Sequence, residues 1–159
     1  LRAAEQRAKH EGGRDAFSLS VIKRSGGDLR LTGRWGLPLQ VLSEAIRFLS
    51  DPATSRRAVY NSLEWIRDLP DPRSEPELLE QMLAFQFARQ SSGPARAASA
   101  VLAQQLATLT AQQPGGGLTW LENLLSVAEF LARETRAGVM PHECQLSLSR
   151  TAGCAVSAR

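Results

Sequence analysis

Cysteine is scarce in this chain, and the two cysteines present lie close together. Cys144 and Cys154 both fall near the C-terminus. A single close pair is a poor basis for the disulfide framework that holds small secreted domains together. We therefore expect a reduced, intracellular protein, located in the cytoplasm or the nucleus.

Long hydrophobic runs and targeting signals are lacking as well. Every apolar stretch contains Glu, Arg or Gln before it reaches about 18 residues, the length that suggests a membrane span. No charged-then-apolar leader opens the chain. The sequence therefore predicts no membrane association. Because the chain starts at Leu1, in a stretch that looks like part of a longer helix or linker, we expect a fragment of a larger protein.

Histidine is equally scarce, and this limits the chemistry that the chain can perform. The stretch His142-Glu143-Cys144 is the one place where an imidazole and a thiol lie close in sequence, but it supplies no orienting third group. Structural zinc sites normally show a tight Cys or His pair, and the sequence has none. The acidic residues between positions 68 and 80 suit the dipole of a helix start. We therefore predict no catalytic, cofactor-binding or metal-binding residues, and no enzyme activity.

Lysine is rare, whereas arginine is abundant. Lys9 and Lys23 are the only lysines among 19 basic residues. Arginine binds carboxylates and phosphates through a planar fork and also stacks on aromatic rings. Residues 1–36 carry eight basic and four acidic side chains, while residues 37–90 carry six basic and eight acidic ones. The positive charge is therefore concentrated in the first part of the chain.

That first part also carries the pattern of a β-hairpin. Apolar and polar residues alternate within residues 17–34, as they do in half-buried strands. Ser25-Gly26-Gly27-Asp28 supplies the glycines that a tight hairpin loop needs. Two strands alone are marginally stable in water, so we expect a third strand or a helical floor. Because residues 145–150 repeat the alternation, we predict that they pair with the hairpin.

Between these two segments, five amphipathic stretches predict helices. Apolar residues recur at spacings of three and four, and proline or glycine separates each stretch from the next. Ser74 and Thr119 each stand three residues before a Glu, which is the spacing of a capping box. The predicted helices cover residues 38–49, 52–69, 75–90, 94–113 and 119–136.

The predicted fold class is mainly α with a small β element (α+β). We expect a five-helix bundle with an N-terminal β-hairpin joined by a C-terminal strand, forming a single domain at 17–150. Residues 1–16 are expected to be a linker or the end of a preceding helix, and residues 151–159 a tail. The helix breaks are nearly evenly spaced, so a short α-solenoid is the minor alternative.

The predicted function is a non-catalytic protein–protein interaction or scaffolding domain of a larger multi-subunit protein, with another protein chain as its partner. An apolar helix surface, Arg-rich polar faces and an exposed strand edge suit complex assembly. The alternative is nucleic-acid binding, with the basic hairpin acting as a wing on the phosphate backbone. The candidate contact residues are Lys23, Arg24, Arg30, Arg34, Trp35, Arg56 and Arg57.

Overall fold

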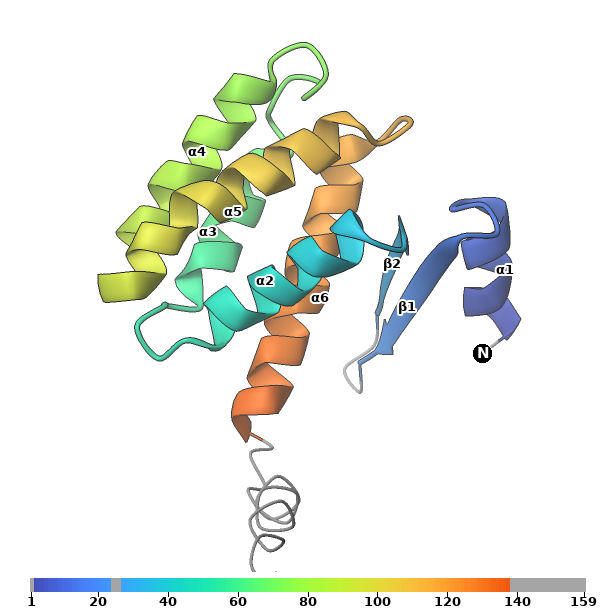
Figure 1. Cartoon of the computed structure of the whole chain (residues 1–159), viewed down its shortest axis with the longest axis horizontal. Helices are drawn as coiled ribbons and strands as arrows, with labels where there is room; N and C mark the ends of the chain where they lie inside the picture. The colour runs from blue at the N-terminus through green and yellow to red at the C-terminus, as the bar shows by residue number, and fades with distance from the viewer. Residues whose placement is uncertain (1, 24–26, 138–159) are drawn as a thin grey trace, which may run out of the picture.

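The computed structural model describes residues 2–23 and 27–137 of the chain. This part is mainly helical with one antiparallel hairpin, which is the predicted α+β class (Figure 1). The elements in chain order are α1 (Arg2–His10), β1 (Ala16–Ile22), β2 (Asp28–Arg34), α2 (Leu37–Ser50), α3 (Arg57–Ile66), α4 (Pro76–Arg89), α5 (Gly93–Ala111) and α6 (Gly117–Ala137).

Helix α6 lies at the centre of the fold. It packs against α2, α3, α5 and β2, while α4 packs against α5 and α3. Leu121, Leu124 and Val127 on α6 are fully buried. In a solenoid each helix pair would contact only its neighbours, whereas here one helix contacts elements from most of the chain. The described helices therefore form a bundle.

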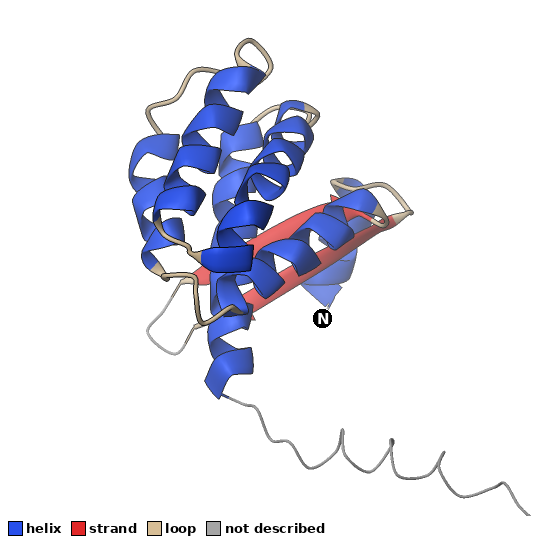
Figure 2. Ribbon diagram, turned by 60° about the vertical axis from the view of Figure 1, so that its left-hand side comes forward, coloured by secondary structure: helices blue, strands red, loops and turns tan. Residues whose placement is uncertain are grey.

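The hairpin lies between the bundle and α1 (Figure 2). Its register pairs Phe17 with Gly33 and Leu19 with Leu31, so these residues share one face. Phe17 and Leu31 are buried in the same core as the helices. The period-two pattern of the sequence thus corresponds to an apolar face turned toward the bundle and a polar face turned toward α1.

The polar face of the hairpin holds α1, although α1 itself has no buried residue. Arg7 donates a hydrogen bond to the Ser20 hydroxyl, and the Thr32 hydroxyl donates to the Glu11 carboxylate at 3.0 Å. The stretch 1–16, expected as a linker or the end of a preceding helix, thus contains a helix bound by polar contacts to the hairpin. The helices described number six, because α1 adds to the five predicted ranges.

One predicted helix start was wrong by several residues, and local hydrogen bonds explain the difference. The helix expected at 52–69 begins only at Arg57, because the Asp51 carboxylate accepts the Ala53 amide and forms a turn instead. The Ser55 amide then donates to the Gln90 carbonyl at 2.7 Å, which ties this turn to the connection between α4 and α5.

The two predicted capping boxes do not form. Glu75, not Ser74, is the N-cap residue of α4, and it makes no side-chain capping bond. Thr119 lies inside α6, which begins at Gly117. In both cases the helix begins within two residues of the predicted cap. Helix α4 begins at Pro76, and α6 begins at Gly117, directly after the turn glycines Gly115 and Gly116.

Two further sequence predictions concern the C-terminal part of the chain. The predicted strand at 145–150 and the tail at 151–159 lie outside the described residues. The sheet within 2–23 and 27–137 contains the two strands of the hairpin. Among these same residues, no helix combines the length and the apolar character needed to cross a membrane.

Trp120 connects α6 to the hairpin. Its indole Nε1 donates to the backbone carbonyl of Thr32 at 2.8 Å, across 88 positions of sequence. Unpaired carbonyl groups in partly buried places are costly, so this bond matters more than an exposed one. The contact fixes β2 against the start of α6.

We expect Trp120→Phe to lower the free energy of unfolding by about 1–3 kcal/mol, because the Thr32 carbonyl loses its donor while most of the ring remains. Urea denaturation measures this difference. Trp65→Phe is the matched control, since no side-chain hydrogen bond of Trp65 is found in the described part of the chain. Equal losses in the two variants would contradict a role for the indole N–H.

Candidate functional site

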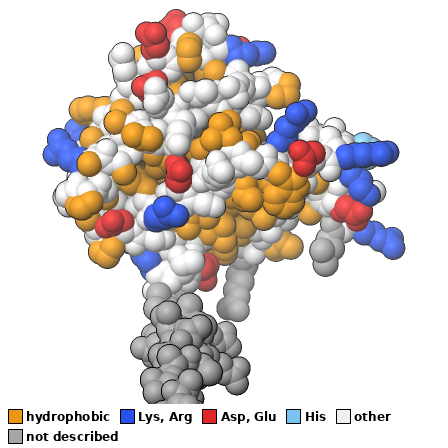
Figure 3. Space-filling view, viewed as in Figure 1, with side chains coloured by type: hydrophobic (Ala, Val, Ile, Leu, Met, Phe, Trp, Pro, Cys, Tyr) orange, Lys and Arg blue, Asp and Glu red, His pale blue; other side chains and the backbone are white. Residues whose placement is uncertain are grey.

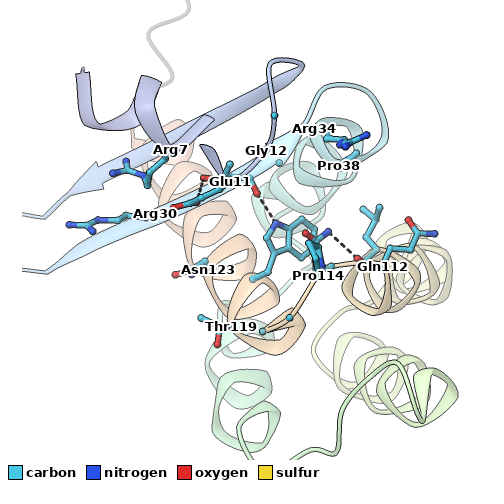
Figure 4. A pocket seen from close by; sticks show the side chains of 18 of the residues that line it. Arg7, Glu11, Gly12, Arg30, Arg34, Pro38, Gln112, Pro114, Thr119 and Asn123 are labelled. Atoms are coloured by element: carbon cyan, nitrogen blue, oxygen red, sulfur yellow. Dashed lines mark hydrogen bonds between the residues drawn. The ribbon is translucent and has the colours of Figure 1, made fainter. Parts of the chain in front are cut away.

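A cleft of about 1150 Å³ opens between the hairpin and the start of α6 (Figure 4). One wall consists of β2, the end of α1 and the turn into α2. The other wall consists of the end of α5, the loop 112–116 and the first turns of α6. Segments from four distant parts of the sequence therefore meet at this place.

The glycines of the α5–α6 connection shape the second wall. Gly115 and Gly116 have φ angles of +67° and +63°, which L side chains rarely adopt. A Cβ atom on Gly117 would lie 2.5 Å from the Thr110 carbonyl oxygen. The Gly-rich stretch therefore makes a tight turn, after which α6 packs against strand β2 of the hairpin.

Trp35 and Leu37 stand on the rim of this cleft, and both are half exposed. The exposed fractions of the two residues are 54% and 46%. Trp35 rests against Phe17, with ring centroids 5.6 Å apart. Gly36, with a φ of +91°, provides the bend between the two residues. Figure 3 shows hydrophobic side chains on the surface where α2 meets the hairpin.

The arginines of the cleft do not converge on one point. In Figure 4 Arg7 and Arg30 extend toward one side of the cleft, whereas Arg34 extends toward the other. Arg30 also pairs with Asp28 at 3.1 Å. Glu11 adds one negative charge to the lining. The arrangement is thus a basic rim spread along the cleft and not a pocket for one compact anion.

The remaining predicted contact residues lie elsewhere or outside the described part. Lys23 is exposed at the end of β1, and Arg24 falls among the residues that are not described. Arg56 pairs with Glu129 of α6 at 3.7 Å, and Arg57 opens α3. Because α3 packs on α4 and α6, away from the hairpin, this pair does not join the basic hairpin residues (Figure 1).

Sequence reasoning missed most of the cleft, since only Arg30, Arg34 and Trp35 of the predicted contact residues line it. Arg7 and Glu11 belong to the stretch interpreted as a linker or the end of a preceding helix, and Trp120 and Asn123 belong to a predicted helix of the bundle. No local sequence pattern predicts a contact between segments that lie so far apart in the chain. The turn glycines were visible in the sequence, but they indicated only a connection between helices.

Neighbouring basic side chains lower the pKa of two exposed carboxyl groups, Glu5 and Asp71. Among residues 2–23 and 27–137 no group of three His, Cys, Asp or Glu side chains is placed to hold a metal ion. Hydrogen bonds from Arg73 to Asp71, first from its side chain and then from its backbone amide, lower the pKa of the exposed Asp71 carboxyl. Lys9 lowers the pKa of Glu5 in the same way. The candidates at His142 and Cys144 lie outside this part of the chain.

We expect Arg73→Ala to raise the pKa of Asp71 toward its ordinary value, because the guanidinium contact is lost and only the backbone bond remains. The stabilising effect of this contact is present above the ordinary pKa of Asp and disappears as the pH falls through the lowered pKa. An NMR titration of the Asp71 carboxyl measures the change. An unchanged pKa would show that the side-chain contact is absent in solution.

The comparisons with known proteins add no function to this arrangement. No protein-family model, no curated protein and no solved structure matches the chain. The candidate site is thus defined by its own contacts: a cleft, a half-exposed Trp35–Leu37 pair and a basic rim.

Proposed function

We propose that the chain is a non-catalytic protein–protein interaction or scaffolding domain that binds another protein chain at the cleft. The observation that carries this proposal is the half-exposed pair Trp35 and Leu37 on the cleft rim. Interface hot spots are enriched in Trp and Arg and lie next to well-packed pockets. Because Phe17 supports the Trp35 ring, the side chain loses little freedom when a partner covers it.

The charges around the cleft indicate the kind of partner. Arg7, Arg30 and Arg34 outnumber Glu11 among the charged residues of the lining. Complementary charge steers association and excludes wrong partners more than it adds affinity. We therefore infer a partner segment in which an apolar side chain is flanked by acidic residues.

We expect the double substitution Trp35→Ala and Leu37→Ala to weaken partner binding by about 2 kcal/mol or more, which is roughly 30-fold, because the apolar anchor contact is lost. The measurement is affinity capture from cell lysate with nuclease treatment and high-salt washing, followed by titration of the identified partner. The wild-type chain should retain a stoichiometric protein that the double variant loses.

Tyr60→Ala is the matched control for this experiment, because Tyr60 is a similarly exposed aromatic residue on α3, at 55%. It should retain the same partner. Retention of that partner by the double variant would contradict the cleft as the binding surface. Melting curves of both variants verify that the fold is intact.

The alternative function is nucleic-acid binding through the hairpin end. It is favoured by the basic side chains that Figure 3 shows over the region of α1 and the hairpin. Helix α1 carries Arg2, Arg7 and Lys9. Arg30, Thr32 and Arg34 stand two residues apart, so all three share one face of β2. Spread guanidinium groups suit successive backbone phosphates better than a single anion.

If the alternative holds, replacing Arg30 and Arg34 by Ala should reduce affinity for duplex DNA and flatten its salt dependence by about two units of slope. Fluorescence anisotropy at several salt concentrations measures both quantities. Replacing Arg56 and Arg57 by Ala is the control, since these residues lie apart from the hairpin. Absence of DNA binding by the wild-type chain would remove the alternative.

A further inference from the structure

Gly33 is a buried residue of strand β2, and its backbone conformation does not require glycine. Its φ is not among the positive ones, in contrast to that of Gly36. Glycine inside a strand is unfavourable, because it has no side chain to pack and loses much conformational freedom on folding. Such a glycine often marks a place where another group approaches the backbone closely.

The group that approaches Gly33 is the ring of Phe17. The two residues are direct partners in the register of the hairpin. A Cβ atom on Gly33 would lie 3.0 Å from Cζ and 3.1 Å from Cε1 of the Phe17 ring, and 3.3 Å from Cβ of Pro38. Carbon atoms in ordinary contact are about 3.5–4.0 Å apart. An alanine at this position would therefore displace one of the two neighbours by a few tenths of an ångström.

Both neighbours of Gly33 adjoin the half-exposed pair on the cleft rim. The Phe17 ring contacts the Trp35 ring in a tilted arrangement, with an interplanar angle of 52°, which is typical of attractive aromatic pairs. Phe17 is buried in the common core, whereas Trp35 is half exposed. Pro38 directly follows Leu37 in the chain. The space over Gly33 therefore affects where the ring that supports Trp35 can lie.

We propose that Gly33 is a positioning residue of the binding surface: because it has no side chain, the Phe17 ring lies where it holds Trp35 in the orientation that a partner meets. This inference rests on the proposed function of the Trp35–Leu37 pair and deepens it. Gly33 is buried, so it acts through Phe17 and not by touching the partner. A side chain that is ordered before binding loses less conformational entropy when a partner covers it.

The first test follows the indole N–H signals of the free, full chain by NMR. The signal that disappears in Trp35→Phe belongs to Trp35, and the signal of Trp65 on α3 is the internal reference. We expect Gly33→Ala to shift the Trp35 signal, to lower its heteronuclear NOE and to weaken the NOEs between the Trp35 and Phe17 rings. The Trp65 signal should stay in place, which shows that the fold is intact.

The second test asks whether Gly33 acts through Phe17. In Phe17→Leu the shorter side chain leaves room over Gly33, so adding Gly33→Ala in this background should change the Trp35 signal little further. The same comparison applies to the affinity for the protein identified by capture with the wild-type chain. There we expect Gly33→Ala alone to raise the dissociation constant about three- to tenfold, and to have little effect once Phe17 is leucine.

The proposal is overturned by a Trp35 signal that Gly33→Ala leaves unchanged, by an equal effect of this substitution in both backgrounds, or by an unchanged affinity. Should Gly33→Ala fail to fold, Phe17→Leu alone decides, since a Trp35 indole as ordered as in the wild type would show that Phe17 does not hold it. Retention of the partner by the Trp35→Ala, Leu37→Ala variant would contradict the proposed function instead, because the NMR measurements on the free chain do not depend on a partner.

Discussion

The hydrogen bond between the Trp120 indole and the Thr32 carbonyl joins the hairpin to the helical bundle, and several other features depend on it. A two-stranded hairpin is marginally stable alone, so β2 needs a surface to pack on. Helices α2 and α6 provide that surface, and Trp120 fixes its position along the strand. Thr32 and Trp120 both line the cleft, so the position of β2 and part of the candidate site depend on the same contact.

The two faces of the hairpin are used in different ways. The apolar face contributes Phe17 and Leu31 to the common core, where burial supplies most of the stabilisation. The polar face holds α1 through single hydrogen bonds, such as the one that Arg7 donates to the Ser20 hydroxyl. Contacts of this exposed kind contribute little free energy each. We therefore expect α1 to be the least strongly held of the described elements, although it lines one side of the cleft.

The sequence predictions were accurate for features that depend on residues close together in the chain. They were less accurate for contacts between distant segments. Helix identity depends on spacing within one segment, and each of the five predicted ranges overlaps an observed helix. The starts were less reliable, because a turn at Asp51 and the tight loop at Gly117 compete with local capping patterns. The sequence made Trp35 a candidate contact residue because of its residue type and its position after the hairpin. In the structure Trp35 is half exposed, and its ring rests against Phe17. Arg7 and Asn123 were missed, since they reach the cleft through contacts between distant segments.

By itself the sequence determined the helix-rich class, the hairpin and its apolar face, because periodicity and turn residues act over a few positions. Only the tertiary structure decided which helices pack against the hairpin, which elements form the cleft, and that Arg56 and Arg57 lie apart from the hairpin arginines. These outcomes depend on how α6 packs across β2, and no local pattern encodes a contact between residues 88 positions apart.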